Sequence, residues 1–239
     1  MRRLRTFVAV ELGPRVRTKA QKLIRRLTET GVEANWIPPE QMHLTLKFLG
    51  EILETEIVDV CRVVAAAVAD ADPFEITFRG AGAFPDLTNP KTLWVGITDG
   101  IEELVDLQQR VEAALHRELR FPRERRQYTP HLTIGRVKRT AEAAEALAEV
   151  LTAAADFDGD LTVVDEVTTF ASFLSKSGPT YEALAHAPLG KPVATKKMDE
   201  DEEDVEEDED FEDEFDEDFD DDSDLDDEED DESDDEQPK

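Results

Sequence analysis

The last 41 residues, from Asp199 to Lys239, cannot build a hydrophobic core, and they therefore limit the folded part of the chain to what precedes them. They hold 31 of the 59 acidic residues and one lysine, a net charge of −30. Such a segment repels itself and has too little apolar surface to offset the entropy of ordering. Residues 1–198 keep 28 acidic and 26 basic side chains, a net charge of −2. We predict a globular domain at 1–190, a linker at 191–198 and a disordered acidic tail at 199–239.

The folded part is long enough to be stable without covalent or metal cross-links, since a domain of about 150 residues already buries roughly two thirds of its unfolded surface. Cys61 is the only cysteine, so an intrachain disulfide cannot form. No stretch approaches the ~20 apolar residues of a membrane span. The apolar run that follows the basic start is shorter than that of a signal peptide. We therefore expect a cytoplasmic monomer that does not contact a membrane.

Strand and helix patterns follow one another in two similar passes along the folded part. The first pass predicts a strand at 5–12, a helix at 15–30, a strand at 43–50, a helix at 54–69 and a strand at 74–80. The second predicts a strand at 92–98, a helix at 101–119, a strand at 131–137 and a helix at 141–154, and closing strands follow within 161–174 and 180–185. This order indicates two similar lobes that share a cleft.

Two of the four histidines begin the same phrase, HLTLKFLG at His43 and HLTIGRV at His131, 88 residues apart. Because side chains alternate along a strand, each histidine shares a face with the threonine two residues later, Thr45 or Thr133, while the leucine between them points into the core. A lone phrase of this kind is weak evidence for a site. Its recurrence at corresponding positions of the two passes makes the histidines the candidate catalytic residues.

Two imidazoles that flank one phosphorus can divide the work of acid–base catalysis, since histidine titrates near neutral pH. One takes a proton from water and the other gives a proton to the leaving oxygen. Hydroxyl groups and cations nearby would stabilise the charge that develops on the phosphoryl oxygens. By strand alternation Lys47 lies on the face of His43, whereas Arg136 lies on the wrong face unless the chain bends.

A metal site is the other chemistry that a histidine pair allows. No third and fourth ligand stands at a spacing typical of zinc sites, and we therefore expect acid–base catalysis without a metal or another cofactor. The two remaining histidines, His116 and His186, lack the phrase and are expected to be structural or exposed to solvent.

Four segments together resemble the bacterial and archaeal RNA 2′,3′-cyclic phosphodiesterases, also called 2′-5′ RNA ligases, of the two-histidine phosphoesterase superfamily. They are WIPPEQMHLTLKFLG, NPKTLWVGI, YTPHLTIGRV and SGPTYEALAHAPL, and the resemblance spans about residues 3–189. It implies an α+β fold of two pseudo-symmetric lobes, in which antiparallel sheets line a central cleft and helices lie outside.

The same resemblance implies metal-independent hydrolysis of RNA 2′,3′-cyclic phosphate ends, tRNA fragments among them, to 2′-phosphomonoesters. His43 would be the proton donor and His131 the acceptor, while Thr45 and Thr133 bind the phosphate. Arg136 stands at the arginine position of the family's H-x-T-x-x-R pattern and would contact the phosphate as well. Alternatives that stay open are 2′-5′ ligation, hydrolysis of small cyclic phosphates such as an ADP-ribose derivative, and a non-catalytic module that binds through the acidic tail.

Basic residues also gather outside the two phrases, in RFPRERRQY at 120–128 and at Arg2, Arg3 and Arg5. Clustered arginines are typical of surfaces that bind nucleic-acid phosphates. We expect the acidic tail to be a solvated segment that aids solubility. The alternatives are that the basic patches hold RNA or the acidic tail of the same chain, or that the tail binds a basic partner.

Overall fold

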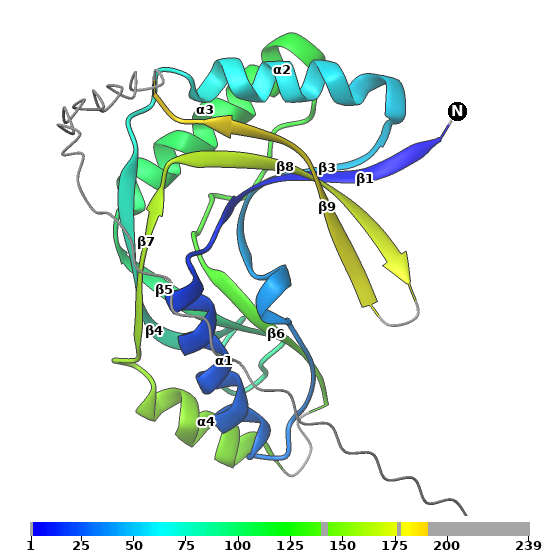
Figure 1. Cartoon of the computed structure of the whole chain (residues 1–239). Coiled ribbons are helices and arrows are strands. Elements are labelled where there is room, and N and C mark those ends of the chain that lie inside the picture. Colours follow the sequence, from blue (N-terminus) through cyan, green and yellow to red (C-terminus); the bar gives the residue numbers. More distant parts are fainter. Residues whose placement is uncertain (1, 140–142, 176–177, 191–239) are drawn as a thin grey trace, which may run out of the picture. The chain divides into compact units, whose positions relative to one another are not determined.

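A computed structural model describes residues 2–139, 143–175 and 178–190, which fold as α-helices around two antiparallel sheets (Figure 1). The predicted linker and acidic tail lie outside the described residues. No helix in the described ranges is long and apolar enough to cross a membrane.

The four-stranded sheet has the order β3-β1-β8-β9. Its strands are β1 (Arg3–Glu11), β3 (His43–Leu53), β8 (Glu166–Ser175) and β9 (Gly178–Pro188). All neighbouring pairs run antiparallel. The first histidine phrase therefore lies on an edge strand.

The five-stranded sheet has the order β2-β6-β5-β4-β7. Its strands are β2 (Glu33–Trp36), β4 (Phe74–Phe84), β5 (Thr92–Asp99), β6 (Leu132–Arg139) and β7 (Asp158–Val164). All neighbouring pairs are again antiparallel. The second histidine phrase leads into β6, between β2 and β5.

Helices pack on both sheets. The described helices are α1 (Pro14–Thr28), α2 (Ile57–Val68), α3 (Ile101–Leu119) and α4 (Ala144–Ala153), with short 3₁₀ turns η1 (Pro39–Gln41) and η2 (Glu54–Glu56). Helices α2 and α3 contact the four-stranded sheet, and α1 and α4 contact the five-stranded sheet, as Figure 1 shows. The predicted α+β architecture with antiparallel sheets is confirmed.

The two sheets do not correspond to the two passes of the sequence. Strands β2 and β4 come from the first pass yet lie in the five-stranded sheet, and the closing strands β8 and β9 return to the four-stranded one. Helix α1 likewise follows a strand of one sheet and packs on the other. The chain thus crosses repeatedly between the sheets, which connects the surroundings of the two histidines.

Sequence patterns located most elements within a few residues but missed β2. Its four residues, EANW, alternate between exposed and half-buried positions at the edge of a sheet, so the hydrophobic signal is weak. Local signals fix the starts of two helices. Pro14 opens α1 at a position where a missing N–H costs nothing. Gly100 precedes α3 with φ of 77°, and a Cβ there would collide with the carbonyl oxygen of Glu75.

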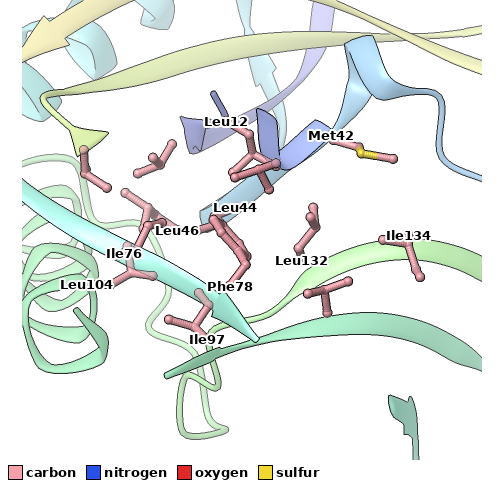
Figure 2. Packing of buried hydrophobic residues seen from close by; sticks show 14 of the residues in the cluster. Leu12, Met42, Leu44, Leu46, Ile76, Phe78, Ile97, Leu104, Leu132 and Ile134 are labelled. Carbon is pink, nitrogen blue, oxygen red and sulfur yellow. The ribbon is translucent and has the colours of Figure 1, made fainter. Parts of the chain in front are cut away.

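The apolar residues of both histidine phrases belong to one hydrophobic core. Leu44 and Leu46 of β3 and Leu132 and Ile134 of β6 are at most 3% exposed, and Figure 2 shows them together with Phe78 of β4. Strands β3 and β6 also contact each other although they lie in different sheets. The shared core therefore fixes the position of one phrase relative to the other.

Leu132→Ala tests this anchoring. Leu132 is fully buried, so its truncation should lower the free energy of unfolding by about 2–5 kcal/mol through lost burial and the cavity that remains. Urea denaturation measures the change. Leu161→Ala is the control, because Leu161 is 45% exposed on β7 and its truncation should cost under about 1 kcal/mol. Equal losses in the two variants would contradict the anchoring role.

Candidate active site

The two histidines occupy equivalent places, each at the start of its strand. His43 is the first residue of β3, and His131 directly precedes β6. Both side chains are partly buried. Each ring thus projects from the rigid end of a strand whose next residue is fully buried, which limits its movement.

Each ring is also held by a hydrogen bond to the main chain two residues earlier. Nδ1 of His43 lies 2.7 Å from the carbonyl oxygen of Gln41, and Nδ1 of His131 lies 2.8 Å from that of Thr129. A carbonyl oxygen can only accept, so Nδ1 carries the proton and donates it in both rings. In the neutral imidazole Nε2 is then the free basic atom, which suits both rings to proton transfer at Nε2.

Aromatic side chains pack against both imidazoles. The Phe7 ring of β1 stacks on His43 with centroids 4.8 Å apart, and Tyr181 of β9 meets His43 edge-on at 5.3 Å. At the other phrase Phe84, at the end of β4, meets His131 edge-on at 5.0 Å. Sequence patterns did not identify these three residues, because strand pairing, which a single sequence does not reveal, brings them to the histidines.

Burial lowers the pKa of His43 below its ordinary value, because the protonated imidazolium loses hydration among these aromatic rings. The Gln41 carbonyl and the negative charge of Glu11 oppose the shift, and both raise the pKa. His43 is therefore a weaker base than a solvent-exposed histidine, and its proton affinity depends on a carboxylate at the end of β1.

A β-bulge interrupts β3 directly after Thr45. Thr45 pairs with Ala9 and Lys47 pairs with Val8, so the intervening Leu46 has no partner. The extra residue turns the following side chains to the opposite faces. Lys47 thus points toward the core and α3 rather than along the face of His43, and the expected alternation is wrong at this residue.

Lys47 is engaged in a buried ion pair. Its side chain is 2% exposed, and Nζ donates to Oε1 of Glu112 on α3 at 2.7 Å and to the carbonyl oxygen of Pro122 at 2.8 Å. Glu124 lies 3.6 Å away. These partners occupy the ammonium group, and its predicted contact with phosphate stays a prediction. In place of Lys47, the bulge brings Phe48, which is 60% exposed, to the face of Phe7 and His43.

A bulge in β6, like the one in β3, reverses the strand face on which Arg136 lies. Thr133 pairs with Trp94 and Gly135 with Leu93, so Ile134 has no partner on β5. Arg136 then pairs with Thr92, which shares a strand face with Trp94. Arg136 therefore lies on the face of Thr133, exposed to solvent. The bulge is the bend that Arg136 needs in order to lie on the same face as Thr133.

Tyr181 of the four-stranded sheet is affected by the charge of Arg136 in the five-stranded sheet. Burial raises the pKa of its phenol, and the positive charges of Arg136 and Arg5 oppose that shift. Arg136 belongs to the five-stranded sheet, whereas Tyr181 lies beside His43 in the four-stranded sheet. The guanidinium of one phrase thus acts on the surroundings of the other phrase's histidine.

One group of side chains in the described ranges has the composition of a metal site. Single ligand atoms of Glu11, Glu166 and His186 lie within 4.8 Å of one another. Nδ1 of His186 is already 3.0 Å from Glu166 and 3.1 Å from the hydroxyl of Thr168, and this hydroxyl lies 3.3 Å from Oε1 of Glu11, so hydrogen bonds connect the group. His116 likewise bonds the carbonyl oxygen of Phe121 at 2.8 Å, a structural contact.

Sequence comparison relates the chain to one family. The model of the 2′-5′ RNA ligase superfamily matches residues 16–169. An RNA 2′,3′-cyclic phosphodiesterase of Thermotoga maritima is 32% identical over 182 residues, 76% of this chain and 93% of that protein. One of Archaeoglobus fulgidus is 33% identical over 183 residues, 76% of this chain and 98% of that protein.

Solved structures show the same fold. The protein TT0787 of Thermus thermophilus superimposes with a TM-score of 0.61 at 26% identity and covers 78% of this chain and 98% of its own. E. coli LigT in its apo form gives a TM-score of 0.62 at 21% identity over 80% of this chain and 99% of its own.

Lys47→Met tests whether Lys47 is structural. The change leaves Glu112 without its cation in a nearly buried place, and it should lower the free energy of unfolding by about 3–5 kcal/mol in urea denaturation at pH 7. The double variant Lys47→Met/Glu112→Leu removes both charges and should recover part of that loss. A single variant as stable as the wild type, but with weakened phosphate binding, would instead restore the site role first expected of Lys47.

Proposed function

Because the chain belongs to the 2′-5′ RNA ligase superfamily, we propose that it hydrolyses RNA 2′,3′-cyclic phosphate ends to 2′-phosphomonoesters by acid–base catalysis of its two histidines. The observation that carries the proposal is the equivalence of His43 and His131. Both precede a threonine by two residues, and both donate Nδ1–H to a carbonyl, which leaves Nε2 for the substrate. The names of the relatives supply the substrate class.

The reaction exchanges one P–O bond for another. Nε2 of His131 takes a proton from water as the water oxygen attacks phosphorus, and the bond from phosphorus to O3′ breaks. Nε2 of His43 gives its proton to O3′, which leaves as a hydroxyl group, and the phosphate stays on O2′. The two histidines end with their protonation states exchanged, and proton exchange with solvent restores them.

Three further side chains suit the phosphoryl oxygens. The hydroxyls of Thr45 and Thr133 share strand faces with the histidines, and the exposed guanidinium of Arg136 supplies positive charge where negative charge develops. Lys47 is left out of this set because Glu112 and Pro122 hold its ammonium group. The proposed reaction uses no metal, since two positioned imidazoles supply both proton transfers.

His43→Ala and His131→Ala should each reduce hydrolysis of a 2′,3′-cyclic phosphate RNA end by about 10²–10⁴-fold, the usual contribution of a positioned acid or base. The measurement is the initial rate in the presence of EDTA. Analysis of the wild-type product should find the phosphate on O2′. Phosphate on O3′, or a joined RNA, would contradict the proposed reaction.

His186→Ala is the matched control. It removes a histidine from the four-stranded sheet and also one ligand of the group that resembles a metal site. Its activity in EDTA should fall by less than about tenfold, because His186 belongs to neither phrase and acts on His43 only through the charge of Glu11. Loss of activity in this control as large as in the two histidine variants would overturn the site assignment.

Glu11→Gln tests which histidine donates the proton. Glu11 raises the pKa of His43, so its neutralisation should lower that pKa further, as an NMR titration of the imidazole would show. At pH 8 only a small fraction of His43 is protonated. If His43 is the donor, kcat/KM at pH 8 should fall tenfold for each unit by which its pKa falls.

The opposite assignment gives a different result. A His43 that accepts the proton is already neutral at pH 8, so Glu11→Gln would leave kcat/KM unchanged there. Glu103→Gln, which neutralises an exposed carboxylate in the first turn of α3, controls for the general loss of one negative charge and should alter neither the pKa of His43 nor kcat/KM.

Three further expectations stay predictions: tRNA fragments as the natural substrate, the monomeric state and the cytoplasmic location. Docking of the acidic tail concerns residues outside the described ranges.

A further inference from the structure

An arginine-rich loop leads directly to the second histidine. Twelve residues, 120–131, separate the end of α3 at Leu119 from the start of β6 at Leu132, with neither helix nor strand. Loops of this length without regular structure are uncommon in compact domains and are usually functional. Arg123, Arg125 and Arg126 are exposed, and none forms an ion pair with a residue in the described ranges.

The loop is held in place at both ends. Phe121 and Tyr128 pack against the hydrophobic core, and burial raises the pKa of the Tyr128 phenol. At the start of the loop His116 bonds the carbonyl oxygen of Phe121, and at its end His131 bonds that of Thr129. The arginines therefore belong to a segment with fixed ends, which reduces the entropy lost when they bind a ligand.

The buried ion pair also fixes the first half of the loop, at Pro122 and Glu124. Lys47 donates to the carbonyl oxygen of Pro122, and Oε1 of Glu112 accepts from the backbone N–H of Glu124 at 2.8 Å. Glu124 is the only acidic residue of the loop, and its carboxylate lies 3.6 Å from Nζ of Lys47. Lys47 thus holds the one negative charge of the loop near itself, whereas Arg123 still acts on the charge of Glu112 and lowers its pKa. Arg125 and Arg126 form no ion pair with a residue in the described ranges.

The position of the arginines limits what they can bind. Arg126 precedes His131 by five residues, so the backbone distance between them is at most about 18 Å. An anion on these arginines would then lie within a few nucleotides of a phosphate bound at the histidines. The body of the protein is nearly neutral, which makes this cluster a local feature and not part of a general positive charge.

We propose that Arg123, Arg125 and Arg126 form a binding surface for the phosphate backbone of the single RNA strand that ends in the cyclic phosphate. This inference rests on the proposed function and adds a second contact region to it. Lys47 and Glu112 act as positioning residues that hold the surface. The surface binds RNA without sequence preference, because guanidinium groups bind the phosphates of any nucleotide.

The test compares two substrates of the full-length protein, 2′,3′-cyclic AMP and a ten-nucleotide RNA with a 2′,3′-cyclic phosphate end. The triple variant Arg123→Gln/Arg125→Gln/Arg126→Gln should raise KM for the RNA at least tenfold at low salt. KM and kcat for the mononucleotide, which has no further phosphates, should stay within about twofold. The slope of log(kcat/KM) against log salt for the RNA should become shallower by about 2, since each single-strand phosphate contributes roughly 0.7.

A variant of equal charge on another surface is the control. Lys22→Gln/Arg25→Gln/Arg26→Gln removes three exposed cations from α1 that likewise form no ion pair with residues in the described part of the chain, and it should behave as the wild type. Equal effects of the two triple variants on the RNA, or equal effects of the loop variant on both substrates, would overturn the proposal.

Binding without turnover separates this inference from the proposed function. Fluorescence anisotropy with a labelled RNA that ends in a 2′-phosphate measures affinity even if no hydrolysis occurs. Wild-type protein that hydrolyses neither substrate but binds the RNA through the loop would refute the proposed function alone. Hydrolysis of both substrates with unchanged RNA affinity in the loop variant would refute the surface alone.

Discussion

The site depends on one hydrogen bond made twice, from the Nδ1–H of a histidine to the carbonyl oxygen two residues earlier. This bond selects the tautomer, orients the ring and leaves Nε2 for proton transfer in the proposed reaction. It can do so because the strand that follows each histidine is fixed by fully buried residues, Leu44 and Leu132, in a single core. The chain crosses between the two sheets several times, so the two rings belong to one compact unit.

A bulge three residues after each histidine decides what else reaches the site. In β3 it turns Lys47 inward and Phe48 outward, and in β6 it leaves Gly135 on the inner face and brings Arg136 to the face of Thr133. Gly135 is suited to its place, because a Cβ there would come within 2.7 Å of the Trp36 ring. The same irregularity at the same step of both phrases supports the similarity of the two passes more strongly than their residues do, which differ outside the phrases.

The sequence was sufficient to predict that His43 and Thr45 share a strand face, since a period of two holds over the first three residues of the phrase. It was not sufficient to predict the strand faces of Lys47 and Arg136. A bulge adds one residue, so every side chain after it points to the opposite face. Nor did it predict that Phe7, Phe84 and Tyr181 surround the imidazoles, since they come from strands whose pairing requires the fold. The α+β class was implied by the family resemblance, whereas the exchange of strands between the sheets was not predicted.

Phe48 and Arg136 occupy corresponding positions five residues after their histidines and differ sharply in chemistry. Two half-sites with equal residues would bind a small diester equally well in either of two orientations. An aromatic ring on one flank and a guanidinium on the other remove that ambiguity, because the first favours a flat base and the second favours an anion. In the proposed reaction, this pair of unlike residues would give the site a polarity along the nucleic-acid chain.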